Sequence, residues 1–153
     1  MSDFGTDNNL TLKGIGGWLV IIAIGVFVNP ISILFTLLKY YIIPLFHKGI
    51  LISLIKNMHL FMLISFEVFI NLILFAFSIF ILIMFIKKSK NFPILFVIYS
   101  ASKVVFNIMD TVLSIGDGQT QPNFPYITGI AIGSIIWSLY MLKSRRVKNT
   151  FVN

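Results

Sequence analysis

The sequence has no cysteine, only two histidines and only five acidic residues, and each shortage removes a class of function. Without cysteine there are no disulfides, no thiolate nucleophile and no thiolate metal ligand. His47 and His59 have no acidic residue close by, so a histidine metal site is not expected. No nucleophile–base pair or nucleotide-binding loop is present either. We therefore predict no catalytic residue, no cofactor, no metal and no enzymatic activity.

Charged residues are scarce as well, at 11% of the chain, whereas 58% is hydrophobic and the mean hydropathy is +0.96. A soluble domain of 153 residues needs more polar surface than this to cover its core. Four runs are apolar enough and long enough for the roughly 20 helical residues that cross a bilayer. The sequence predicts an all-α fold, a four-helix transmembrane bundle. It forms a single integral membrane domain over residues 1–153, with spans at 15–38, 60–86, 93–115 and 126–142.

Basic residues are distributed unevenly around these spans. Three lie between the first and second spans, and the third connection has none. The side that holds both termini has eight: Lys13, Lys87, Lys88, Lys90, Lys143, Arg145, Arg146 and Lys148. Cytoplasmic loops carry the excess of lysine and arginine, so both termini are predicted to be cytoplasmic. The net charge of +7 then encodes orientation, and no nucleic-acid partner is predicted.

The first connection, residues 39–59, is too apolar for an ordinary loop. Its stretch "FHKGILISLIKNMHLF" mixes aliphatic residues with Lys48, Lys56 and His59. One interpretation is an interfacial helix between spans 1 and 2, interrupted by Pro44 and Gly49. The other is a second span that starts earlier and is tilted.

Polar residues inside the spans form two helix faces. At steps of three and four the third span carries Lys103, Asn107 and Asp110, flanked by two serines, and the second carries Glu67 and Asn71. A charged side chain near the bilayer centre costs about 2.5–3.5 kcal/mol on insertion scales, so the two faces should point at one another. Glu67 and Asp110 are expected at similar depth in the outer half, with Lys103 about 10 Å deeper.

This intramembrane polar cluster has two interpretations. Ionisable residues within a membrane indicate a proton or ion site by default. The alternative is a static network that fixes how the helices pair, in which Lys103 contacts Asp110, Asn107 and Glu67. Two carboxylates facing one lysine resist joint ionisation, so one is expected to keep a proton in either case.

Three short motifs have structural interpretations. "GIGGWL" at 14–19 departs from G-x-G-x-x-G spacing, so it indicates a flexible start to the first span with Trp18 at the interface. "NP" at 29–30 predicts a helix kink. "GIAIG" places Gly129 and Gly133 four residues apart, which favours close helix packing within the chain, with dimerisation as the alternative.

The basic tail directly follows the last span and consists of Lys143, Arg145, Arg146 and Lys148. It is either a topology signal alone or a contact with anionic lipid headgroups, worth about 1 kcal/mol per residue near the surface. Tyr140 and Phe151 flank it, and interfacial aromatics of this kind favour a tail that lies on the membrane.

Several segments together resemble a known family. "GIGGWL", "FEVFIN" at 66–71, "NFP" at 91–93 and "IWSLYMLKSRRVKNTFV" at 136–152 occur in the order found in the YdgK-like family. Its members are small bacterial inner-membrane proteins with four spans and a domain of unknown function. The resemblance implies a bacterial inner membrane location and supplies no activity. The chain departs from the family in its first connection, which is often longer and more polar there.

The function best supported by the sequence is a non-enzymatic membrane component that acts through protein or lipid contacts, with a membrane protein of unknown identity as partner. The alternative is a small transporter or proton-coupled subunit that uses Glu67, Lys103 and Asp110. A continuous hydrated path to Glu67 and Asp110 would favour transport, whereas a closed, dry and fully paired cluster would favour the first interpretation.

Overall fold

The computed structural model describes residues 14–47, 49, 52, 54, 56–116 and 124–153. The first long helix consists of α2 (Trp18–Thr36), the π-helical η1 (Leu37–Ile42) and α3 (Ile43–Leu45). It is followed by α5 (Met58–Ile86), α6 (Phe92–Gly116), α7 (Phe124–Lys143) and the short α8 (Arg145–Thr150). Within the described residues, four helices are long and apolar enough to cross a membrane. The predicted all-α, four-span architecture is confirmed.

The first span differs most from its predicted bounds. It continues to Leu45 rather than ending at 38, because η1 extends the helix through Lys39 without a break. The part of the predicted interfacial helix at 39–45 therefore belongs to the first span. Residues 48, 50–51, 53 and 55 lie outside the described residues, so the rest of that prediction is not decided there.

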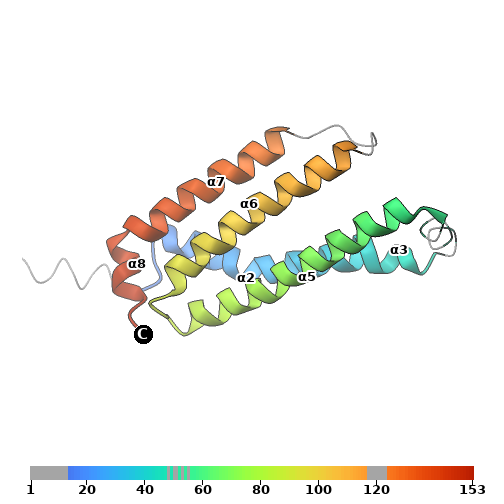
Figure 1. The fold of residues 1–153 in the computed structure, drawn as a ribbon. Helices are drawn as coiled ribbons and strands as arrows, with labels where there is room; N and C mark the ends of the chain where they lie inside the picture. Colours follow the sequence, from blue (N-terminus) through green and yellow to red (C-terminus); the bar gives the residue numbers. More distant parts are fainter. Residues whose placement is uncertain (1–13, 48, 50–51, 53, 55, 117–123) are drawn as a thin grey trace, which may run out of the picture.

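The helices form two pairs that meet at one end of the molecule. Along the chain α2 packs on α5, α5 on α6, and α6 on α7. Figure 1 shows that the α6–α7 pair lies close to the other helices near α8 and diverges from α5 and α3 toward the opposite end. We refer to these as the α8 end and the open end.

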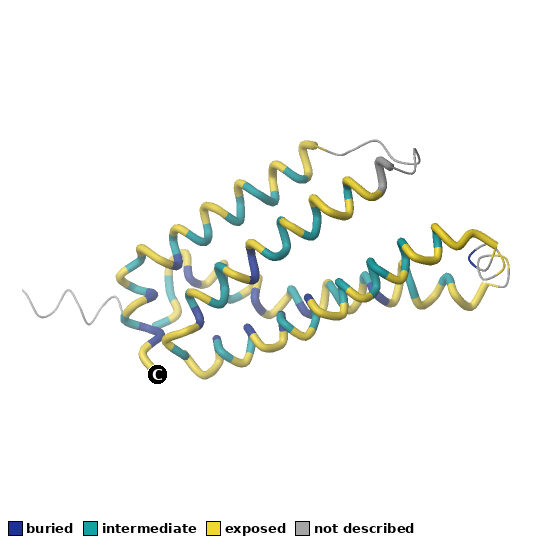
Figure 2. The backbone as a smooth tube through the Cα atoms, viewed as in Figure 1, coloured by how far each residue is buried: buried dark blue, intermediate teal, exposed yellow. Residues whose placement is uncertain are grey.

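Buried side chains concentrate toward the α8 end (Figure 2). The hydrophobic core there joins residues from every long helix and from the tail: Leu19, Ile22, Val26, Leu74, Ile81, Phe85, Phe92, Tyr99, Met141, Val147 and Phe151. Elsewhere large hydrophobic side chains such as Ile24, Phe69 and Ile135 are exposed, as expected for surfaces that face lipid.

The last residues close the α8 end of the bundle. Phe151 is buried, and its ring stacks on Phe92 with the ring centroids 4.5 Å apart. The Lys90 N–H donates to the carbonyl of Asn153 at 2.6 Å, and the Asn153 N–H donates to the Lys88 carbonyl at 3.2 Å. The expectation that Phe151 is an interfacial aromatic is therefore wrong, because it packs into the protein core instead.

Two glycines of "GIGGWL" have positive φ angles in the turn that precedes α2. Gly17 precedes α2 with φ 57° and ψ −138°, and Gly14 has φ 96°, which are values that residues with a Cβ rarely adopt. The N–H of Gly14 donates to Thr150 Oγ1 at 3.1 Å, so this turn is joined to α8. The start of the first span is thus a specific turn held against the tail.

Gly129 and Gly133 lie on α7 without a closely packed helix beside them. A Cβ on either glycine would meet nothing within 4 Å among the described residues. Close packing at these glycines within the chain and dimerisation through them both stay predictions.

Candidate functional site

A cavity of about 360 Å³ lies between α2, α5 and α6. All five members of the predicted polar cluster line it: Glu67, Asn71, Lys103, Asn107 and Asp110. The remaining polar lining residues are Asn29, Ser32, Thr36, Tyr41 and Tyr126. The polar faces of the second and third spans thus line the same cavity, as expected from the sequence. The role of these residues stays a prediction.

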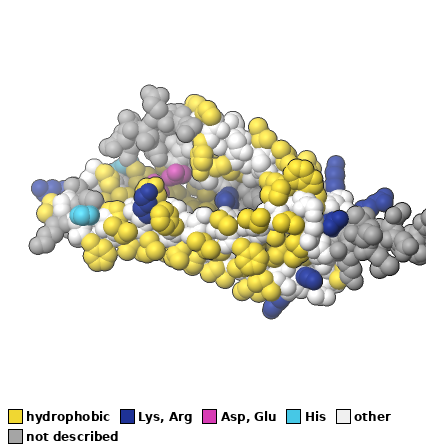
Figure 3. Space-filling model, turned by 180° about the vertical axis from the view of Figure 1, so that it is seen from behind, with side chains coloured by type: hydrophobic (Ala, Val, Ile, Leu, Met, Phe, Trp, Pro, Cys, Tyr) yellow, Lys and Arg dark blue, Asp and Glu magenta, His cyan; other side chains and the backbone are white. Residues whose placement is uncertain are grey.

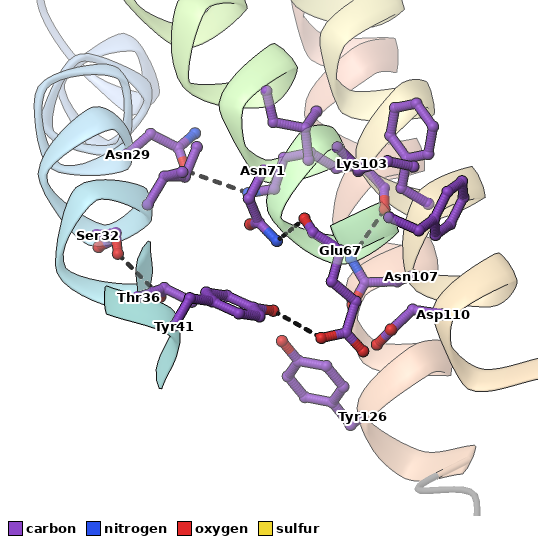
Figure 4. A pocket seen from close by; sticks show the side chains of 15 residues that line it. Asn29, Ser32, Thr36, Tyr41, Glu67, Asn71, Lys103, Asn107, Asp110 and Tyr126 are labelled. Carbon is purple, nitrogen blue, oxygen red and sulfur yellow. Dashed lines mark hydrogen bonds between the residues drawn. The ribbon is translucent and has the colours of Figure 1, made fainter. Parts of the chain in front are cut away.

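Two acidic side chains and two tyrosines form one end of the cavity. The Tyr41 hydroxyl donates to Glu67 Oε2 at 3.1 Å, and the Glu67 side chain is within hydrogen-bonding range of Asp110. Figure 4 shows the two carboxyl groups side by side, with the Tyr126 hydroxyl directed toward them. Carboxyl groups this close favour holding a proton or a cation between them, because their joint negative charge is otherwise unbalanced.

Lys103 forms the basic end of the cavity. Its Nζ donates to Asn29 Oδ1 at 3.1 Å and lies 5.8 Å from the centroid of the Tyr99 ring. Asn29 belongs to α2, which the sequence analysis did not include in the cluster. The position of Lys103 seven residues before Asp110 separates their α-carbons by about 10 Å along α6.

The two asparagines of the predicted cluster are held by their own helices. Asn71 Nδ2 donates to the Glu67 carbonyl at 2.9 Å, and Asn107 Nδ2 donates to the Lys103 carbonyl at 2.8 Å. These bonds span four residues and fix the two amides beside the charged residues (Figure 4). The amides therefore supply an oriented polar lining between the acidic and basic ends.

The first span contributes polar residues that were not predicted from the sequence. Asn29, Ser32 and Thr36 follow each other at steps of three and four, so a helical wheel would have found this face. Tyr41 was missed because the span was expected to end at 38. Tyr126 has no comparable signal in the sequence, since a tyrosine at the start of a span usually indicates an interfacial anchor.

The cavity opens on the flank of the bundle and is closed toward α8. The space-filling view in Figure 3 shows a hollow on one long side of the molecule, with acidic and basic side chains visible inside it and hydrophobic ones around it. Toward α8, Leu74 of the lining is followed by the buried Ser78, Ile81 and Tyr99. The arrangement is that of a polar chamber reached from one side and sealed at the α8 end.

The chemistry of the lining suits ionic binding. No group of three or more His, Asp or Glu side chains able to hold a metal ion occurs among the described residues. What the chamber offers is two carboxyl groups, one ammonium group, amides and hydroxyls, which together can hold a charged or zwitterionic group.

A family model for proteins of unknown function (DUF2569) matches residues 12–152. The chain belongs to this family. No protein with a curated description and no solved structure matches it. The chain is thus a multi-span membrane protein of the DUF2569 family.

Proposed function

We propose that this protein is a non-enzymatic component of a bacterial inner membrane that binds a positively charged polar ligand in the cavity, as a small proton-coupled transporter does. The observation that carries the proposal is the lining of the cavity, in which Glu67 and Asp110 lie side by side on two candidate membrane-spanning helices. An intramembrane carboxyl pair is costly to keep, and a static bundle could be built from apolar residues instead.

An orientation with both termini cytoplasmic supports the proposal. The α8 end carries the positive-rich connection between α5 and α6 together with the basic tail. The open end carries the α6–α7 connection, which has no basic residue, and the first connection, which has fewer basic residues than the α8 end. By the positive-inside rule the α8 end is then cytoplasmic. The cavity would face the outer side of the membrane and be closed on the inner side, as in one state of an alternating-access cycle.

The carboxyl pair suits exchange between a proton and a cation. A proton held between Glu67 and Asp110 balances part of their charge, and an arriving ammonium group can replace it. The Tyr41 hydroxyl, which donates to Glu67, orients this carboxyl toward the chamber. Loss of either carboxyl group would leave one carboxylate, whose negative charge is balanced by the Lys103 ammonium without a bound proton.

A second candidate function is action through protein or lipid contacts, favoured by α8. Lys143, Arg145 and Lys148 are exposed although the tail itself is docked on the bundle. Their charges are available to anionic headgroups or to an acidic surface of a partner membrane protein. This use is compatible with a ligand in the cavity, because the two sites lie at opposite halves of the molecule.

A hydrophobic carbodiimide tests the carboxyl pair directly, because it modifies carboxyl groups that hold a proton within a membrane. We expect one adduct per chain at Glu67 or Asp110 in proteoliposomes at neutral pH, located by peptide mass spectrometry. Methylammonium at millimolar concentration should slow the total modification, counted as carbodiimide adduct plus methylamide, several-fold, whereas sodium at the same ionic strength should not.

The matched control is the double variant Glu67→Gln with Asp110→Asn, which should form no adduct in α5 or α6. A rate of modification that is the same with and without methylammonium would overturn the proposal, since a site that binds cations must be protected by one. Absence of any adduct in the unchanged protein would overturn it as well.

A further inference from the structure

This inference rests on the proposed function. The direction in which the cavity opens determines the route by which its ligand can enter. The lining comes mainly from α2, α5 and α6, with Tyr41 from η1 and Tyr126 from α7. The hollow in Figure 3 lies on one long side of the molecule, and hydrophobic side chains are found at its rim. In a bilayer this flank faces acyl chains, so a ligand can arrive sideways from the lipid.

The polar lining has two poles of opposite charge. Glu67 and Asp110 lie together at one pole, and Lys103 with Asn29 lies at the other. The poles are separated by about two turns of α6. A ligand that satisfies both needs a cationic group joined by a short chain to an anionic group.

The cationic pole selects the kind of ammonium group. Glu67, Asp110 and the tyrosine hydroxyls present several oxygen acceptors close together (Figure 4). A primary ammonium has three N–H donors to match them, whereas a quaternary ammonium has none. At the other pole the Lys103 ammonium and the neighbouring amides suit a phosphate.

We propose that the cavity binds the head group of a phosphatidylethanolamine-type lipid that enters sideways from the outer leaflet. Its ammonium group lies between Glu67 and Asp110, and its phosphate lies at Lys103. A volume of about 360 Å³ is at the lower end for small-molecule pockets, so it holds a head group and leaves the acyl chains outside. The exposed hydrophobic surface around the hollow receives those chains.

Zero-length cross-linking of the purified full-length protein in vesicles tests this inference. A carbodiimide activates a carboxyl group, and a primary amine held beside it attacks to form an amide while the carbodiimide leaves as its urea. In vesicles of phosphatidylethanolamine and phosphatidylglycerol we expect the lipid to be joined to the peptide that contains Glu67 or Asp110. Replacing phosphatidylethanolamine by phosphatidylcholine should abolish the adduct.

Two variants and one soluble probe make the outcome decisive. Glu67→Gln with Asp110→Asn should reduce lipid trapping at least tenfold, and Lys39→Met, outside the cavity lining, should leave it unchanged. Free phosphoethanolamine should be trapped far less than the lipid. Equal trapping of both, or trapping of the soluble compound alone, would overturn lateral lipid binding while leaving the cation site intact. If the lipid is not trapped but methylammonium still protects the carboxyl groups, lateral lipid binding is likewise overturned and the cation site remains. If protection is absent too, the proposed function also fails.

Discussion

Replacing Phe151 with alanine is expected to lower the free energy of unfolding by about 3–5 kcal/mol, the range for removing a buried phenylalanine side chain. Phe151 is 4% exposed, and its ring contacts those of Phe92 and Phe85. The substitution removes the side chain that joins the end of α8 to the end of α5 and the start of α6. Unfolding in detergent micelles titrated with SDS measures the change.

The neighbouring Val152 is the matched control, because it is 59% exposed. Val152→Ala should change the free energy of unfolding by no more than about 0.5 kcal/mol. Phe151→Ala and Val152→Ala proteins of equal stability would show that the tail is not docked as described.

Replacing Lys103 with methionine is expected to weaken lipid retention roughly ten- to hundredfold, because a charge-assisted hydrogen bond contributes about 1.5–3 kcal/mol. Among the residues that the structure describes, Lys103 is the only basic one that lines the cavity. Native mass spectrometry of protein purified in mild detergent gives the retained phosphatidylethanolamine per chain.

The same change should alter stability little. The hydrogen bond from Lys103 to Asn29 is lost, but so is the cost of holding an ammonium group within the membrane. If the free energy of unfolding changes by no more than about 1 kcal/mol while lipid retention falls, Lys103 acts in ligand binding. Strong destabilisation that is reversed by also removing both carboxyl charges would instead support the static network considered from the sequence. The Lys39→Met variant controls for loss of a lysine.

The spans could be predicted because bilayer thickness and the scarcity of charge leave few alternatives. The end of the first span could not, because Lys39 resembles a loop residue. In the structure Lys39 lies within η1, and its Nζ is 5.0 Å from the centroid of the Tyr40 ring. For the same reason Tyr41, which donates a hydrogen bond to Glu67, was not predicted to lie in the first span.

The polar cluster was predictable from helical periodicity on the second and third spans. Asn29 was not predicted to belong to the cluster, because an asparagine followed by a proline in a span indicates a helix kink. The docking of Phe151 could not be read from local sequence at all. An aromatic residue near a basic cluster suits a membrane interface equally well, and only tertiary packing against Phe92 decides between the two.

The most direct measurement of the proposal, a polar cavity that is hydrated from the outer side and closed toward the cytoplasm, is the reactivity of single cysteines. The chain has no cysteine, so Ser32→Cys, Ser65→Cys and Ser78→Cys each introduce one thiol. Ser32 lines the cavity, Ser65 is exposed on α5 outside the lining, and Ser78 is buried beneath the cavity. Only a thiol in water ionises and reacts readily with a charged, membrane-impermeant reagent. With the reagent on the outer side, the cysteine at 32 should react at least about tenfold faster than those at 65 and 78. Equal, slow reaction at all three positions, or reaction at 32 only from the cytoplasmic side, would contradict the account.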